Sequence, residues 1–92
     1  MFSPEIASWL NEKSYLYSYQ DKMELALATI EEAIAVAPDN PNYLDTKGEF
    51  LLKMGRIDEA LAIYHQILQM DADYFKNTES ELEKGLKEAG RI

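Results

Sequence analysis

Carboxylates are the most numerous side chains in this chain that could carry acid–base chemistry, and they recur at helical spacing. The 92 residues include 17 Asp and Glu, of which Glu24, Glu31 and Glu32 are typical, as are the glutamates of residues 79–83. A catalytic pair needs one carboxyl group whose pKa is raised beside an ionised partner. Carboxylates that repeat along a polar helix side are usually solvated, so we interpret these groups as exposed faces.

The sequence also shows no arrangement of residues that is typical of a catalytic nucleophile, a metal site or a phosphate-binding loop. The single histidine, His65, has Glu59 and Gln66 nearby, but no spacing that is typical of a metal site. The chain has no cysteine, no serine in a nucleophile-elbow context, and no phosphate loop among its four glycines. We therefore expect no enzyme activity, no catalytic residue, no metal and no cofactor.

Tyrosine is the other residue type with useful chemistry, and three tyrosines alternate in the stretch Y-L-Y-S-Y. Strict alternation over Tyr15, Tyr17 and Tyr19 is typical of a half-buried strand. In a helix, however, each residue turns by about 100°. Tyr15 and Tyr19 would then share one face, and Tyr17 would point roughly the other way. The elements around the stretch must decide between these interpretations.

Charge restricts the classes of partner. The net charge is −8 and the isoelectric point is about 4.5, so most of the surface would repel a phosphate backbone or an anionic membrane. The first residues, M-F-S-P-E-I-A-S, contain neither a basic region nor a long apolar run, which argues against a signal peptide or a membrane span. Together with the absence of cysteine, this favours a cytoplasmic protein that binds neither nucleic acid nor membranes.

A repeat of 34 residues organises the chain, which we expect to form a single domain over residues 1–92. With a shift of 34, residues 7–40 lie over residues 41–74 without a gap, and six positions are identical where chance would give about two. The identical pairs are Leu10/Leu44, Lys13/Lys47, Ala26/Ala60, Leu27/Leu61, Ala28/Ala62 and Asp39/Asp73. Each copy is therefore expected to form the same local structure.

The second copy contains the start and stop signals of two helices. Pro41 follows Asn40 as a first helical residue follows its cap, and Gly55 is placed to end that helix. Asp58 is expected to cap the next helix. That helix has one apolar face, made of Ala60, Leu61, Tyr64, Ile67 and Leu68.

The first copy is expected to do the same. A helix is expected from Ser3-Pro4 to about Gln20, and a second from a capping box with Asp21 as the cap to about Val36. The tyrosine stretch aligns with residues 49–53 and therefore falls inside a helix. Its alternation then comes from two faces that both happen to be aromatic, with Tyr17 directed to the core.

A helix–turn–helix unit of 34 residues resembles the tetratricopeptide repeat, whose pattern is W-x2-L-G-x2-Y, then A-x3-F, then P. The pattern falls on Leu10, Lys13, Ser14, Tyr17, Ala26, Ile30 and Pro38 in the first copy, and on Leu44, Lys47, Gly48, Leu51, Ala60, Tyr64 and Ala72 in the second. Lysine replaces leucine at positions 13 and 47, Ile67 stands where a small residue is usual, and Ala72 replaces proline. The resemblance implies an all-α domain in which antiparallel helix pairs stack as a short right-handed α-solenoid of five helices.

A third unit begins and stops after one helix. Thr78 to Glu81 has the form of a capping box, and Leu82, Leu86 and Ala89 follow on one apolar face. We expect a closing helix over about 78–89, because a helical stack needs a polar outer surface at its end. Residues 71–77 are expected to be a short linker in which Phe75 packs inward.

The resemblance also implies that the chain binds proteins. In tetratricopeptide repeats the first helix of each repeat lines a concave groove that holds a peptide or a partner's helix. The matching positions are Asn11, Tyr15, Tyr19, Asn42, Asp45 and Glu49, with Ser8, Lys53, Ser80 and Lys84 beside them. Asp45 and Glu49 lie four residues apart and repel each other in an empty groove, so we expect a basic or amphipathic peptide as partner. A structural spacer with an ordinary solvated face is the alternative.

Trp9 and Leu16 form a possible second contact surface at the other end of the stack. Their counterparts Tyr43 and Phe50 should face the first repeat's second helix, but only Phe2 and Ile6 are available near Trp9. An uncovered apolar patch usually marks a partner or a missing neighbour. Three alternatives remain open: the chain is part of a longer repeat array, it forms a homodimer through this face, or the residues before Trp9 fold over the patch.

Overall fold

The computed structural model describes residues 4–92, and every regular element in that range is a helix. The helices are α1 (Pro4–Tyr19), α2 (Met23–Val36), α3 (Pro41–Lys53), α4 (Ile57–Met70), α5 (Tyr74–Asn77) and α6 (Glu81–Glu88). The all-α prediction is confirmed, and the tyrosine stretch is helical rather than extended. The expectations for Phe2 and Ser3 lie outside the described residues.

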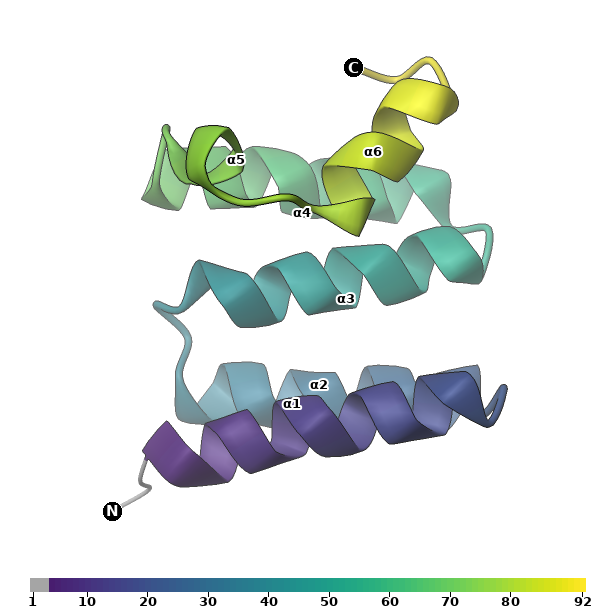
Figure 1. Cartoon of the computed structure of the whole chain (residues 1–92), viewed down its shortest axis with the longest axis vertical. Coiled ribbons are helices and arrows are strands. Elements are labelled where there is room, and N and C mark those ends of the chain that lie inside the picture. The colour runs from purple at the N-terminus through teal and green to yellow at the C-terminus, as the bar shows by residue number, and fades with distance from the viewer. Residues whose placement is uncertain (1–3) are drawn as a thin grey trace.

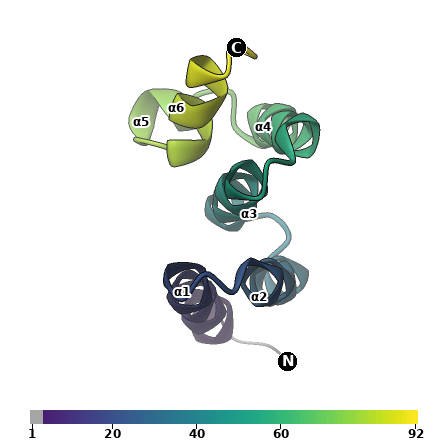
Figure 2. The same ribbon diagram turned by 90° about the vertical axis from the view of Figure 1, so that its right-hand side faces the viewer.

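The helices lie side by side, in layers along the longest axis of the molecule (Figure 1). α1 packs on α2, and α3 packs on α4, as antiparallel pairs (Figure 2). The second pair joins the first mainly through contacts between α2 and α3, while α6 lies against both α3 and α4. This is the architecture of a short helical solenoid, as expected from the repeat.

One apolar core runs through the layers of this stack. Phe50 and Leu51 of α3 are buried at its centre, and Ile30 of α2 and Leu82 of α6 approach it from the two sides. Tyr17 is partly buried against this core, on the other side of α1 from Tyr15 and Tyr19. Tyr15 also packs against the core, so both faces of the tyrosine stretch contribute to it.

Close contact between α3 and α6 depends on a residue without a side chain. A Cβ atom added to Gly48 would lie 2.5 Å from Leu82 Cδ2 and 2.9 Å from Leu82 Cδ1. Leu82 is fully buried, so its side chain has little room to move aside. Gly48 thus sets how closely the closing helix can approach the second repeat.

The expected boundaries of α3 are confirmed. Asn40 is the N-cap, and its side-chain Oδ1 accepts a hydrogen bond of 2.9 Å from the backbone N–H of Asn42. Pro41 occupies the first turn, where its missing N–H has no intrahelical partner to lose. Gly55 follows the helix with a φ of 77°, a left-handed conformation in which a side chain would be strained.

The same left-handed turn ends three helices, and it changes the interpretation of Asp21. Asp21 has a φ of 61° after α1, as Gly55 has after α3 and Gly90 has after α6. The turns are closed by bonds from Lys22 N to Tyr17 O (2.9 Å), from Arg56 N to Leu51 O (2.8 Å) and from Arg91 N to Leu86 O (2.9 Å). Asp21 was expected to cap α2, and this is wrong: α2 is preceded by Lys22, which makes no side-chain capping bond. The backbone needs a left-handed residue at position 21, so its side chain is not placed to cap.

The start of α4 also differs from the expectation. Asp58 was expected to be the cap, but α4 begins at Ile57, so Asp58 lies within the first turn. Its carboxylate instead accepts a hydrogen bond of 2.6 Å from Arg91 Nη2, a residue that follows α6. A negative charge in the first turn of a helix still favours that helix, although it makes no capping bond.

The C-terminal segment holds one more helix than expected. Residues 71–77 were expected to be a linker, but Tyr74–Asn77 form the short helix α5. α6 starts at Glu81 after Ser80, whose Oγ accepts from Glu83 N at 3.2 Å, so the cap is Ser80 and not Thr78. Phe75 packs inward as expected and stacks on Tyr64, with 4.6 Å between the ring centroids.

No helix within residues 4–92 combines the length and the apolar character needed to cross a bilayer.

Candidate functional site

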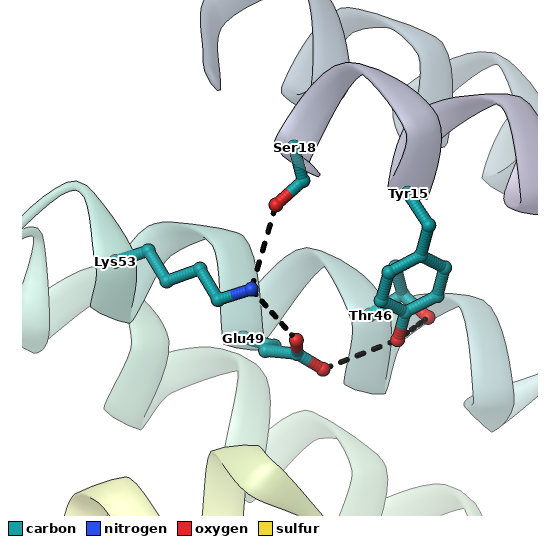
Figure 3. A network of polar contacts seen from close by, with 5 residues as sticks. All are labelled: Tyr15, Ser18, Thr46, Glu49 and Lys53. Carbon is teal, nitrogen blue, oxygen red and sulfur yellow. Dashed lines mark hydrogen bonds and ion pairs between the residues drawn. The ribbon is translucent and has the colours of Figure 1, made fainter. Parts of the chain in front are cut away.

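Tyr15, one of the expected groove residues, connects the two inner helices α1 and α3 (Figure 3). Its hydroxyl donates a hydrogen bond of 3.1 Å to Glu49 Oε1 and lies 3.3 Å from Thr46 Oγ1. Its ring meets Phe50 edge-on, with 5.4 Å between centroids. Burial, followed by the negative charge of Glu49, raises the pKa of Tyr15 to about 12, so the hydroxyl remains a neutral donor at physiological pH.

Glu49 is held from two sides in the same network. Lys53 Nζ lies 3.2 Å from Glu49 Oε2, one helical turn away on α3. Lys53 also donates to Ser18 Oγ of α1 at 3.4 Å, which makes a second link between the inner helices (Figure 3). The carboxylate of Glu49 is therefore already paired with a cation and a hydroxyl inside the protein.

Asp45, the other acidic residue expected in the groove, is tied to the C-terminal segment. Its Oδ1 accepts a hydrogen bond of 2.7 Å from Ser80 Oγ, and its Oδ2 lies 2.8 Å from the hydroxyl of Tyr74. That hydroxyl is also 3.0 Å from Asn42 Oδ1, and its one hydrogen can serve only one of the two oxygens at a time. Asn42 and Asp45 thus hold α5 and α6 against α3.

The remaining two groove positions have different surroundings. Tyr19 is 76% exposed, and its ring centroid lies 6.2 Å from that of Tyr15. Asn11 is partly buried, and no residue of the described part of the chain donates a hydrogen bond to its buried Oδ1. Of the six expected groove residues, Tyr19 therefore offers the most free surface.

Negative charge is concentrated where α3 faces α6. Burial is the largest cause that raises the pKa of Asp45, while its hydrogen bonds from Ser80 and Tyr74 act in the opposite direction. The charges of Glu49 and Glu83 raise the pKa of Asp45 further, as smaller causes than burial. The pKa of Tyr64 is also raised, first by burial and then by Glu83.

An open hollow of about 400 Å³ lies along α6 next to this acidic region. It is lined by Glu79, Ser80, Glu81, Glu83, Lys84 and Lys87. Ser80 and Lys84 were expected beside the groove, whereas Glu83 was not singled out as a binding residue. The pattern Ser80-x-x-Glu83 could have identified it, because a capping serine fixes the position of the residue three places on.

Trp9 and Leu16, the residues of the possible self-association face, lie on the outer side of the stack at α1. Their side chains are 56% and 59% exposed. Lys13 Nζ lies 5.0 Å from the centroid of the Trp9 ring and 5.8 Å from that of Tyr17, a favourable cation–π geometry. The face therefore combines apolar surface with one positive charge.

His65 is exposed on α4, where its ring meets Tyr64 edge-on at 5.6 Å between centroids. Within residues 4–92, no group of three His, Asp or Glu side chains is close enough together to hold a metal ion. The polar contacts of Tyr15, Asp45 and Glu49 described above hold helices together. The exposed side chains around them form surface that a partner could contact.

The sequence of the chain matches the model of one known protein family. No solved structure matches the chain. The model of the tetratricopeptide repeat family matches residues 17–79, about two thirds of the chain, from the end of α1 to the residues just before α6. This range contains the turn after α1, the α3–α4 hairpin and all the pattern positions of the second copy, whereas Leu10, Lys13 and Ser14 of the first copy precede it. The chain therefore belongs to the tetratricopeptide repeat family.

Proposed function

We propose that this chain is a protein-interaction module that binds a basic peptide segment along its inner helices, next to α6. Tetratricopeptide repeats generally mediate interactions between proteins. The observation that supports the choice of ligand is that the charges of Glu49 and Glu83 both act on the partly buried carboxylate of Asp45 and raise its pKa. A lysine or arginine side chain placed there would relieve this repulsion.

Not all six of the expected groove residues are proposed to contact the peptide. Tyr15, Asn42 and Asp45 hold helices together, so we assign them a supporting role. Tyr19 presents a broad exposed ring at one end of the surface, and Glu83 and Lys84 line the hollow at the other. Glu49 lies between them, where its pairing with Lys53 can be exchanged for pairing with a ligand cation.

The test uses a fluorescent amphipathic peptide that alternates lysine and leucine on two helical faces, and a matched peptide with glutamate in place of lysine. Fluorescence anisotropy should show binding of the lysine peptide, and the affinity should fall as salt is raised. The double variant Glu49→Gln, Glu83→Gln should weaken binding by roughly two- to fivefold for each lost charge pair. Tyr19→Ala should also weaken it, because an exposed aromatic contact is lost.

The control is the double variant Glu24→Gln, Glu32→Gln on α2, which changes the net charge by the same amount at exposed positions of another helix. It should leave the affinity close to that of the unmodified chain. Equal weakening by both double variants would mean that only overall charge attracts the peptide, and the proposed site would be wrong.

A further inference from the structure

The outer face of α1 is built as a helix-packing surface, yet no residue of the described chain covers it. This end face consists of Ile6, Trp9, Lys13 and Leu16, which follow one another at intervals of three and four residues and so share one side of the helix. Ile6, Trp9 and Leu16 are among the most exposed large apolar residues of residues 4–92. Scattered exposed apolar residues are common, but three in one row form a patch.

The same row occurs again one repeat later, and there it is covered. Tyr43 and Phe50 occupy on α3 the positions of Trp9 and Leu16 on α1, and both are buried where α3 packs on the first helix pair. Lys47, the counterpart of Lys13, lies 3.8 Å from Glu31 Oε2 on α2. Where the row is covered, on α3, Tyr43 and Phe50 are therefore buried, and Lys47 forms an ion pair with a carboxylate of the covering helix α2.

The opposite end of the stack does not offer a complementary surface. α6 buries Leu82 and Leu86 against the second repeat. Its exposed surface carries charged residues, of which the first three also line the hollow: Glu81, Lys84, Lys87 and Glu88. A second copy that docked its end face on α6 would bury apolar side chains against charges, so head-to-tail growth is disfavoured.

We propose that two copies of the chain dimerise through their end faces, with Trp9 and Leu16 of each copy packed against the same residues of the other. A two-fold contact is self-complementary, because each surface meets itself. The charges on α1 allow such a contact. Glu5 and Glu12 are exposed on α1, one turn from Trp9 and Leu16 respectively, so Lys13 of one copy can meet a carboxylate of the other.

The size of the surface sets the strength to be expected. α1 is about 24 Å long, at 1.5 Å per residue. With α2 beside it at a helix spacing of about 10 Å, the end layer offers roughly 500 Å² for each copy. Two copies would bury on the order of 1,000 Å², which is the lower end of specific interfaces. The dimer should therefore be weak and should form in the micromolar range. The inference concerns another surface than the proposed peptide site and does not depend on it.

Sedimentation measured over roughly 5–500 µM protein tests the proposal. The mass should rise with concentration from 10.6 kDa towards twice that value. Trp9 is the only tryptophan, so a blue shift of its emission with the same concentration dependence would place the contact at the end face. Leu16→Glu should raise the dissociation constant at least about tenfold, and its far-UV circular dichroism should remain that of the unmodified chain because the residue is exposed.

Met70→Glu is the matched control, because it introduces the same charge at another exposed apolar residue, on α4. It should dimerise like the unmodified chain. A mass that stays at 10.6 kDa over the whole range would overturn the proposal and leave the end face to a different partner. A dimer that persists in Leu16→Glu, or that leaves the emission of Trp9 unchanged, would place the contact elsewhere and would also overturn it.

Discussion

The hydroxyl of Tyr15 donates a hydrogen bond to Glu49, and the two residues occupy the same position in successive repeats, 34 residues apart. An inner-helix position of one repeat is thus bonded to its own counterpart in the next. Tyr15 and Glu49 were both expected to be free residues of the binding groove, and here they hold neighbouring repeats together.

Removing the Tyr15 hydroxyl should destabilise the chain without changing its fold. Tyr15→Phe keeps the ring against Phe50 but loses the bond to Glu49, which should lower the free energy of unfolding by about 1 kcal/mol. In a chain of this size, that corresponds to a fall of roughly 4–8 °C in Tm, measured by thermal circular dichroism. Tyr19→Phe removes a hydroxyl from an exposed ring and should leave Tm unchanged. Equal effects of the two variants would argue against a role for the Tyr15–Glu49 bond.

The Tyr15 hydroxyl should also make the stability of the folded chain decrease at alkaline pH. The pKa of Tyr15 is raised from 10.0 to about 12, so the folded chain keeps this proton when the unfolded chain loses it. The stabilisation is fully present below pH 10 and is lost as the pH rises through about 12. The stability of the unmodified chain should therefore fall more steeply over this window than that of Tyr15→Phe, as measured by urea unfolding at each pH. Parallel curves for the two proteins would contradict this.

The two interior glycines that face leucines should respond differently to alanine. Gly48→Ala places a methyl group 2.5 Å from Leu82 Cδ2, and because Leu82 is buried we expect a loss of about 1–3 kcal/mol. A Cβ added to Gly85 would lie 2.6 Å from Leu52 Cδ1, but Leu52 is only partly buried and can turn aside. Gly85→Ala should then be neutral, or stabilising by up to about 1 kcal/mol through helix propensity. Urea unfolding of both variants checks the contrast, and a Gly48→Ala protein as stable as the unmodified chain would show that α6 shifts freely.

Glycine at position 21 should stabilise the chain. Asp21 holds a φ of 61° where the corresponding turns have Gly55 and Gly90, and its charge lies at the C-terminal end of α1. Asp21→Gly should add about 1 kcal/mol to the free energy of unfolding, because the left-handed strain and the unfavourable charge both disappear. Asp21→Ala removes the charge but keeps a Cβ, so it should be less stable than the glycine variant in the same urea titration. An equal gain in both would mean that charge, and not backbone conformation, limits stability at this turn.

Lys53 should act as an internal competitor for the proposed ligand. Its ammonium group lies 3.2 Å from Glu49 Oε2, where a ligand cation is expected. Lys53→Met keeps most of the side-chain volume, and it should tighten binding of the lysine–leucine peptide by roughly two- to fivefold. Lys47→Met makes the same charge change on the same helix, at a residue that pairs with Glu31 of α2, and should have little effect. Weaker binding by Lys53→Met would place the peptide away from Glu49.

Much of the fold could be predicted because its signals are local and repeated. The shift of 34 residues, the cap at Asn40 and the turn at Gly55 define the helices around them without knowledge of distant contacts. Asp21 and Asp58 were misjudged because aspartate favours both helix caps and left-handed turns, and only the backbone path distinguishes these roles. The short helix α5 was missed because Tyr74 is anchored by Asn42 and Asp45, about 30 residues earlier in the chain.

The candidate site could be predicted only in outline. The periodicity places Tyr15, Asp45 and Glu49 on the inner side of their helices, but it does not tell which side chains are already paired. The pairings of Thr46 with Tyr15 and of Tyr74 with Asp45 join different helices over 31 and 29 residues, so no spacing in the sequence reveals them. The pairing of Lys53 with Glu49 has the i,i+4 spacing of one helix and is the one that the sequence could have predicted. Self-comparison did identify the exposed Trp9 and Leu16, since it shows what covers the equivalent residues one repeat later.

The central position of α3 should protect its backbone amides from hydrogen exchange. This helix contacts α1, α2, α4 and α6, whereas α1 and α6 lie at opposite ends of the stack (Figure 2). Opening from either end can release an outer helix while α3 keeps partners on its other side. Backbone amides of α3 should therefore exchange with deuterium most slowly, and protection should decrease towards both ends of the molecule.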